Sequence, residues 1–82
     1  MRKVSENMIL RKFKSEYFLL DSSNEKLHSF NETGNFIFDM WLKGKNKEEI
    51  AEEMTREYEI DKSKAIQDTE DFISNLEKRK II

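Results

Sequence analysis

Few side chains in this sequence could take part in acid–base, metal or nucleophilic chemistry. The chain has one histidine, His28, and no cysteine, which excludes thiolate metal sites and a cysteine nucleophile. Two glutamate pairs, Glu48 with Glu52 and Glu49 with Glu53, have the i,i+4 spacing that could hold a hard cation, but such pairs are typical of a solvated helix face. The two glycines stand apart, so no glycine-rich loop can cradle a phosphate. We therefore expect a binding module with no catalytic residue, no metal and no cofactor, rather than an enzyme.

The length and composition of the chain limit the frame that can position binding residues. Its 82 residues leave room for one domain with a small core. No run of about 18 apolar residues predicts a membrane span, and the charged start lacks the apolar centre of a signal peptide. We expect a cytoplasmic protein without membrane contact, with a flexible N-terminus at residues 1–7 and a single domain at residues 8–82.

Three short strands are predicted in the first 30 residues. MILRKF (8–13) mixes basic and apolar residues in alternation, and YFLLD (17–21) is a short aromatic and aliphatic run. The polar cluster SSNE (22–25) is a turn signal, and KLHSF (26–30) follows it. We interpret these segments as antiparallel strands, with the third at an edge of the sheet.

Three helices are predicted after the strands, and each follows a residue that can cap it, namely Asn31, Asn46 and Asp61. The first helix is apolar over about two thirds of its circumference, so it should be buried between the strands and the other helices. Gly34 allows a close backbone approach in its first turn, and Gly44 suits the position after its end. Three antiparallel strands followed by three helices predict an α+β domain with a winged helix-turn-helix-like fold.

This fold class raises the alternative of a winged-helix DNA-binding regulator. Residues 1–14 carry five basic side chains and one acidic one, whereas the remainder carries 10 basic and 16 acidic. Residues 48–61 include the first helix of the suspected motif and carry seven acidic side chains and one basic one. The second helix of the motif, at 61–80, has as many acidic as basic side chains. DNA affinity depends on cations that face the phosphates, so this charge distribution opposes the alternative, and we expect no nucleic-acid partner.

A series of small motifs follows in order along residues 8–82. They are Phe30-Asn31, Thr33-Gly34, Trp41 in the apolar helix, Gly44, the E-E-I-A run at 48–51, Tyr58, and Asp68 in the last helix. In this order and spacing the chain resembles the PqqD-like family, which is named after the pyrroloquinoline quinone biosynthesis protein D and is also called the RiPP recognition element. YFLLD matches the family's second strand. His28 departs from the pattern, since the family often has a Tyr or another large apolar residue there.

The resemblance implies a role in peptide natural-product biosynthesis. Members of the family bind the leader segment of a ribosomally made precursor peptide and present it to a modifying enzyme. That enzyme is often a radical S-adenosylmethionine (SAM) maturase or, in lasso-peptide pathways, a leader peptidase. The leader is expected to add as an extra strand beside the third strand, against the third helix. Backbone groups of an open edge can hold such a strand, and pockets for alternate side chains give selectivity.

The predicted peptide-binding residues follow from this placement. They are Lys26, Leu27, His28, Ser29, Phe30, Ile66, Thr69 and Ile73. The third helix has two apolar margins, one formed by Ala65, Thr69, Phe72 and Leu76 and the other by Ile66 and Ile73. The sequence does not decide which margin packs on the core and which faces the peptide.

Overall fold

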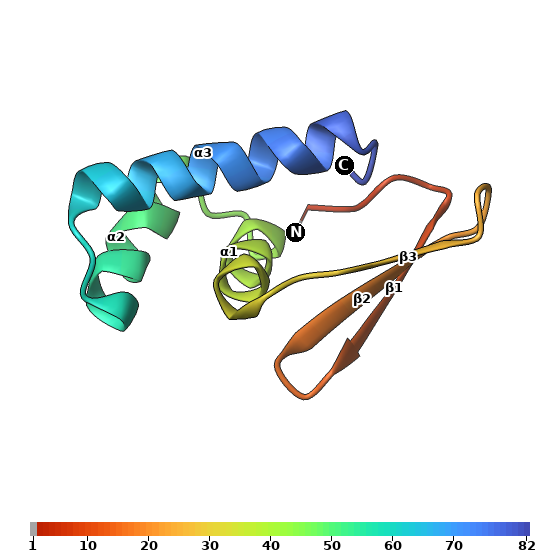
Figure 1. The fold of residues 1–82 in the computed structure, drawn as a ribbon, viewed down its shortest axis with the longest axis horizontal. Helices are drawn as coiled ribbons and strands as arrows, with labels where there is room; N and C mark the ends of the chain where they lie inside the picture. Colours follow the sequence, from red (N-terminus) through yellow and green to blue (C-terminus); the bar gives the residue numbers. More distant parts are fainter. Residues whose placement is uncertain (1) are drawn as a thin grey trace.

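The computed structural model describes residues 2–82, which form a three-stranded sheet followed by three helices (Figure 1). The elements in chain order are β1 (Met8–Phe13), β2 (Glu16–Asp21), β3 (Lys26–Ser29), α1 (Glu32–Leu42), α2 (Lys47–Tyr58) and α3 (Lys62–Lys78). The predicted α+β class and the order of its elements are confirmed. β2 begins one residue earlier than predicted, and β3 ends one residue earlier.

β2 lies in the middle of the sheet and pairs antiparallel with both neighbours. The register places Leu19 of β2 opposite Leu10 of β1 and opposite His28 of β3. Side chains directly opposite each other share a face of the sheet. Leu19 is completely buried and belongs to the hydrophobic core, so this face is the inner one, and β1 and β3 form the two edges.

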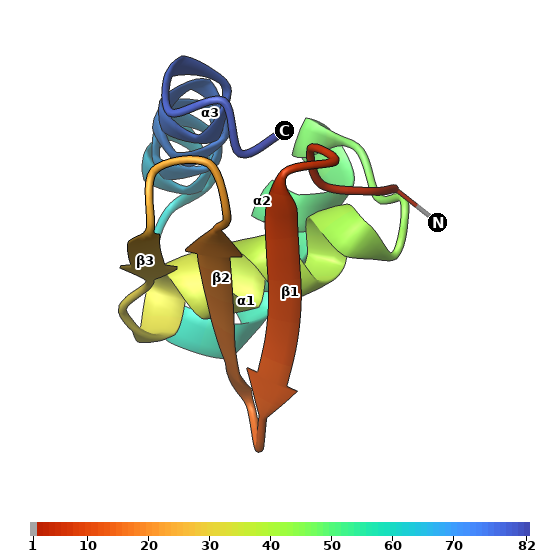
Figure 2. The same cartoon turned by 90° about the vertical axis from the view of Figure 1, so that its right-hand side faces the viewer.

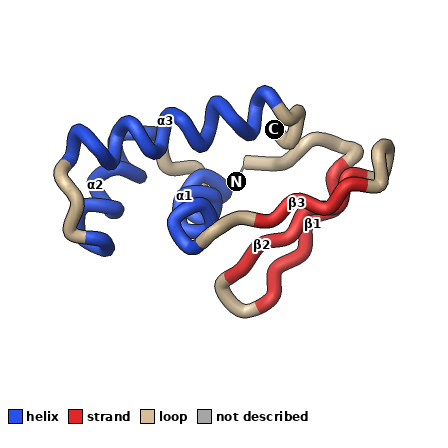
Figure 3. Tube along the Cα trace, in the orientation of Figure 1, coloured by secondary structure: helices blue, strands red, loops and turns tan. Residues whose placement is uncertain are grey.

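α1 lies between the sheet and the other two helices, as Figures 1 and 2 show. On one side, Phe38 packs with Leu19 and meets the ring of Tyr17 edge to face, with 5.1 Å between the ring centroids. On the other side, Ile37 packs in a second cluster with residues of α2 and α3, among them Ile50. Figure 3 shows the resulting separation of the helices from the strands. The predicted position of this helix between strands and helices is confirmed.

Each helix begins at its predicted cap. The side chains of Asn31 and Asp61 accept hydrogen bonds of 2.8 Å from backbone amides in the first turns of α1 and α3. Asn46 and Glu49 form the reciprocal pair of a capping box at the start of α2. Gly44 follows the end of α1 with φ of +90°, a conformation that favours glycine. No helix within residues 2–82 is long and apolar enough to cross a membrane.

The segment before β1 runs along the ends of α1 and α3. The Arg2 guanidinium donates to the carbonyls of Trp41 and Lys45 at 3.3 and 2.7 Å, and it lies over the Trp41 ring. The Ser5 amide donates to the carbonyl of Ile81 at 2.8 Å. Flexibility of residues 1–7 remains a prediction, and Met1 lies outside the described residues.

Candidate functional site

β3 has a neighbour on one side only, so its other side is an open edge. The directions of the N–H and C=O groups of β3 follow from a hydrogen bond at the end of the β1–β2 ladder where Met8 pairs with Asp21. There the amide of Ser22 donates to the carbonyl of Asn7 at 2.9 Å, one position beyond the pair Met8 and Asp21. Hydrogen-bonded and non-bonded pairs alternate along an antiparallel ladder. Asp21 and Leu19 are therefore not bonded to β1, and they direct their backbone groups toward β3.

The partners of Asp21 and Leu19 on β3 are Lys26 and His28. The N–H and C=O groups of Lys26 and His28 consequently face β2. Those of Leu27 and Ser29 face the open edge, because successive residues of a strand direct these groups to opposite sides. The edge thus offers two amide donors and two carbonyl acceptors to a further strand.

The side chain of Asn35 in α1 supports this assignment independently. The amide of Tyr17 donates to Asn35 Oδ1 at 2.8 Å, and Asn35 Nδ2 donates to the carbonyl of Phe30 at 3.1 Å. Tyr17 and Phe30 would be the next bonded pair if the ladder continued, so the carboxamide bridges the two strands where they separate. This buried bridge explains why β3 ends at Ser29 and not at Phe30, the predicted end.

α3 lies above β3 in the view of Figure 2. No Cα atom of β3 lies within 8 Å of a Cα atom of α3. Two hollows lie in this part of the molecule, one of about 390 Å³ between β3 and Arg79, the residue after α3, and one of about 310 Å³ between the start of α1 and α3. The first is lined by Asp21, Asn24, Lys26, Leu27, His28 and Arg79. The second is lined by Asn31, Thr33, Gly34, Ile37, Asp68, Asp71 and Phe72. We call the two hollows together the β3–α3 cleft.

An aromatic contact crosses the base of the β3–α3 cleft. The rings of Phe30 and Phe72 meet edge to face with 5.1 Å between their centroids. Gly34 lies against both residues, and a Cβ atom there would stand 2.9 Å from Phe72 Cε1 and 3.0 Å from Phe30 Cβ. Glycine therefore permits a close approach of α1 to Phe30 and to Phe72 of α3. A close backbone approach at Gly34 was predicted, although its partners were not.

The five predicted residues of the third strand all lie at the β3–α3 cleft or at its edge. Lys26, Leu27 and His28 line the first hollow. Leu27 is 66% exposed, which is high for an apolar side chain in a strand. Ser29 presents its backbone to the open edge, and Phe30 forms part of the aromatic base. Contact of any of these residues with a peptide remains a prediction.

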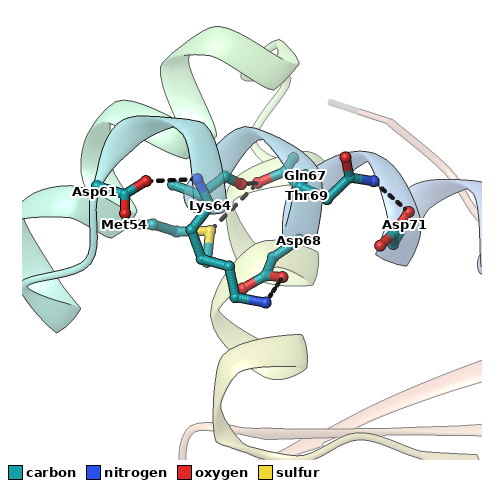
Figure 4. Close-up of polar contacts among 8 residues, drawn as sticks. Met54, Asp61, Lys64, Gln67, Asp68, Thr69 and Asp71 are labelled. Atoms are coloured by element: carbon teal, nitrogen blue, oxygen red, sulfur yellow. Dashed lines mark hydrogen bonds and ion pairs between the residues drawn. The ribbon is translucent and has the colours of Figure 1, made fainter.

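The three predicted residues of the third helix lie elsewhere. Thr69 is completely buried, and its hydroxyl donates to the carbonyl of Ala65 at 2.8 Å and lies 3.2 Å from Met54 Sδ of α2 (Figure 4). Ile66 and Ile73 pack in the cluster that joins α3 to α1 and α2. The structure therefore does not bring these three side chains to the wall of the cleft.

α3 instead presents Asp68, Asp71 and Phe72 to the cleft, and Arg79, the C-cap of the helix, lines it as well. At 100° per residue these four fall within about 100° of arc, so they share one side of the helix. The sequence places Phe72 on one of the two apolar margins and Asp68 among the family motifs, but none of these four residues was predicted as a site residue. The helical period was the signal that could have found them.

The lysines at the start of α3 are already paired with carboxylates. Lys64 Nζ lies 2.9 Å from Asp68 Oδ1 (Figure 4), and this hydrogen bond raises the pKa of the exposed lysine. Lys62 Nζ lies 3.2 Å from Glu52 Oε2 of α2. A recognition helix would need these cations for phosphate contacts. Their pairing gives no support to the DNA-binding alternative.

Tyr17 of β2 and Asp39 of α1 form a second polar contact in which both pKa values are shifted. This contact joins the sheet to α1 and is structural. The Tyr17 hydroxyl donates to Asp39 Oδ1 at 2.5 Å, and burial together with this carboxylate raises the pKa of Tyr17 to about 12. Burial alone would raise the pKa of Asp39, but the bonds from Tyr17 and Lys43 outweigh it and lower that pKa. Within residues 2–82 no three His, Cys, Asp or Glu side chains gather closely enough to hold a metal ion.

Comparison with known proteins adds a family and a shared fold. The model of one protein family, described as Coenzyme PQQ synthesis protein D (PqqD), matches residues 16–82. TbiB1 in complex with the TbiA(beta) leader peptide has a similar structure, with a TM-score of 0.85 and 24% identity over 98% of this chain and 93% of that one. A lasso peptide synthetase B1 complexed with the leader peptide gives a TM-score of 0.87 and 20% identity over 96% of this chain and 93% of the other. No curated protein sequence matches the chain.

Proposed function

Because the chain belongs to the PqqD family, as its sequence motifs predicted, we propose that it binds the leader segment of a ribosomally synthesised precursor peptide and delivers it to a modifying enzyme. The observation that carries this proposal is the open edge of β3, whose free backbone groups border a cleft walled by α3. Two structures that share the fold are complexes with leader peptides, which supports leader binding by this chain.

The leader would bind by adding a fourth strand. The outward N–H and C=O groups of Leu27 and Ser29 pair with the peptide backbone, which aligns the peptide but does not read its sequence. Each such hydrogen bond contributes only about 0.5–1.5 kcal/mol net, because the groups exchange one partner for another. Most of the affinity must then come from side chains that enter the β3–α3 cleft.

The placement of the side chains assigns the walls of the proposed site. On its β3 side, Lys26, His28 and Phe30 direct their side chains to the inner face of the sheet, whereas Leu27 and Ser29 contribute backbone groups and direct their side chains to the outer face. All five remain predicted peptide-binding residues. We assign the α3 wall of the site to Asp68, Phe72 and Arg79, since Thr69 and Ile73 are buried and Ile66 packs toward α2. Phe72 is half-buried and offers its ring to an apolar leader side chain.

Delivery to an enzyme needs a second surface, and the outer face of the sheet offers one. Ile9, Leu20 and Leu27 stand in one cross-strand row on this face and are 39%, 41% and 66% exposed. An apolar row in water is typical of a surface that contacts another protein. The modifying enzyme, a radical SAM maturase or a lasso-type leader peptidase, would supply the chemistry, and the assembly would work in the cytoplasm, where precursor peptides are made.

The experiment removes one outward-facing amide at each edge of the sheet. Peptides selected by the wild-type domain from a displayed random library serve as probes. Ser29→Pro deletes an amide that the proposal assigns to the leader and should weaken binding by about 1–3 kcal/mol. Lys12→Pro deletes an outward amide of β1 and should leave the affinity unchanged. Equal affinity of all three proteins, measured by calorimetry on folded samples, would exclude strand addition at β3.

A further inference from the structure

The β3–α3 cleft has charges of opposite sign at its two ends. Asp68 and Asp71 line the hollow beside the start of α1, and no basic side chain lines that hollow. Lys26 and Arg79 line the other hollow, next to the turn between β2 and β3. The line from one end to the other runs along β3, the edge on which the leader would add.

The charges at the acidic end are partly engaged but keep free acceptors. Asp68 Oδ1 is held by Lys64, and Asp71 Oδ1 accepts a hydrogen bond of 2.9 Å from Gln67 Nε2, as Figure 4 shows. Within residues 2–82 the second oxygen of each carboxylate has no hydrogen-bond partner from the protein. Both carboxylates can therefore bind a further cation without breaking these contacts.

The charges at the basic end have no partner at all within the described part of the chain, since neither Lys26 nor Arg79 forms an ion pair there. Asp21 also lines this hollow, but it is buried, and its carboxylate accepts hydrogen bonds from Asn7, Ser23 and Asn24. Its negative charge reduces the positive potential without cancelling the two exposed cations.

We propose that the cleft selects leaders by charge order, with a Lys or Arg on the N-terminal side of the bound segment and an Asp or Glu on its C-terminal side. This inference rests on the proposed function. It follows from the direction of β3, which runs from the basic end at Lys26 toward the acidic end beyond Ser29. A leader that adds antiparallel, the more stable arrangement, begins at the acidic end and finishes at the basic end.

The geometry also sets the spacing of the two charges. From Asp68 to Arg79 the helix rises about 16 Å at 1.5 Å per residue. An extended strand covers that distance in about five residues at 3.4 Å each. The basic and acidic residues of the leader should therefore stand about five positions apart, with an apolar side chain between them above the Phe30–Phe72 contact.

A displayed library of random peptides tests the charge order without a known leader. The wild-type domain should enrich peptides with a basic residue before an acidic one at this spacing. A variant with all four charges reversed, Lys26→Glu, Asp68→Lys, Asp71→Lys and Arg79→Glu, should enrich the opposite order. The control Glu70→Lys with Glu77→Lys changes exposed charges on the far side of α3 and should select as the wild type does.

Synthetic peptides keep the test decisive if the reversed variant does not fold. For each selected peptide, exchange of its basic and acidic residues should lower the affinity for the wild-type domain roughly three- to tenfold, and less at high salt. Enriched peptides with no charge order, or with the opposite order, would overturn this inference and leave peptide binding intact. Enrichment of no peptide at all would contradict the proposed function itself.

Discussion

The two edge strands of the sheet, β1 and β3, differ in how readily they can pair with an additional strand. At β1, the Arg11 guanidinium donates to the outward-facing carbonyl of Leu10 at 3.0 Å, and the exposed lysines 12 and 14 add positive charge. At β3, the outward groups belong to Leu27 and Ser29, which are uncharged. Edge strands with closely placed cations resist pairing with further chains. The comparison suggests that β1 is protected from pairing, while β3 is left available.

The surroundings of the two edges differ in the same sense. β3 has α3 across a cleft, so a peptide that pairs there would gain side-chain contacts from a second wall. β1 is followed through a two-residue turn by β2, and the exposed Phe13 lies at its end. A hollow of about 540 Å³ lies beside β1, lined by residues 2–6 together with Met8, Leu10, Tyr17 and Leu42. An added strand at β1 would therefore meet the N-terminal segment of the chain and not a wall formed by α3. A wall beside the edge is what makes selective recognition possible at β3.

The largest effect should come from a proline on the inward side of β3. His28→Pro removes an amide that bonds to β2 and should destabilise the fold by about 2–3 kcal/mol, since the Leu19 carbonyl loses its partner. That is a large share of the roughly 4–12 kcal/mol expected for a domain of this length. Chemical denaturation followed by circular dichroism measures the loss. Ser29→Pro, one residue later, should cost much less, and equal losses would mean that the assigned directions of the backbone groups are wrong.

A smaller effect is expected at Gly34, below the β3 edge. Gly34→Val places a branched side chain against Phe30 and Phe72 and should cost about 2 kcal/mol by overpacking. It should also weaken peptide binding, because the Phe72 ring must move into the cleft. Gly34→Ala should fall between wild type and Gly34→Val in both respects. A valine variant as stable as wild type would show that the contact at the base of the cleft is loose.

The smallest effect concerns Asp21, which holds the turn that leads into β3. The pKa of Asp21 is lowered, chiefly by the hydrogen bond from the Asn24 side chain. Burial alone would raise this pKa, but the hydrogen bonds to the carboxylate outweigh it. Because the pKa of Asp21 is lower in the folded protein than in the unfolded chain, the ionised carboxylate stabilises the fold. This stabilisation is fully present above the unfolded-state pKa near 4 and is lost as the pH falls through the lower pKa of the folded protein. Asp21→Asn should therefore be less stable at neutral pH and should lose less stability on acidification. Denaturation of both proteins between neutral and strongly acidic pH checks this; parallel pH profiles would contradict it.

The sequence was sufficient to predict every helix and strand, but not the detailed wall of the site. Asn31, Asn46 and Asp61 are local signals, because a cap acts on amides within three residues of itself. The two apolar margins of α3 look alike in sequence, and only packing against α1 and α2 buries Thr69 and Ile73. The direction of the Leu27 and Ser29 backbone groups depends on which pairs of the ladder are hydrogen-bonded, and the bond from the Ser22 amide to the Asn7 carbonyl shows this.

Amide hydrogen exchange measured by NMR tests the central claim most directly, because it reports on each backbone N–H of β3 separately. In the protein alone, the amides of Lys26 and His28 should be protected and those of Leu27 and Ser29 should exchange fast. Saturation with a selected peptide should protect Leu27 and Ser29, while the outward amide of Lys12 on β1 stays unprotected. If the peptide binds and the exchange of Leu27 and Ser29 does not slow, the open edge of β3 is not where it binds.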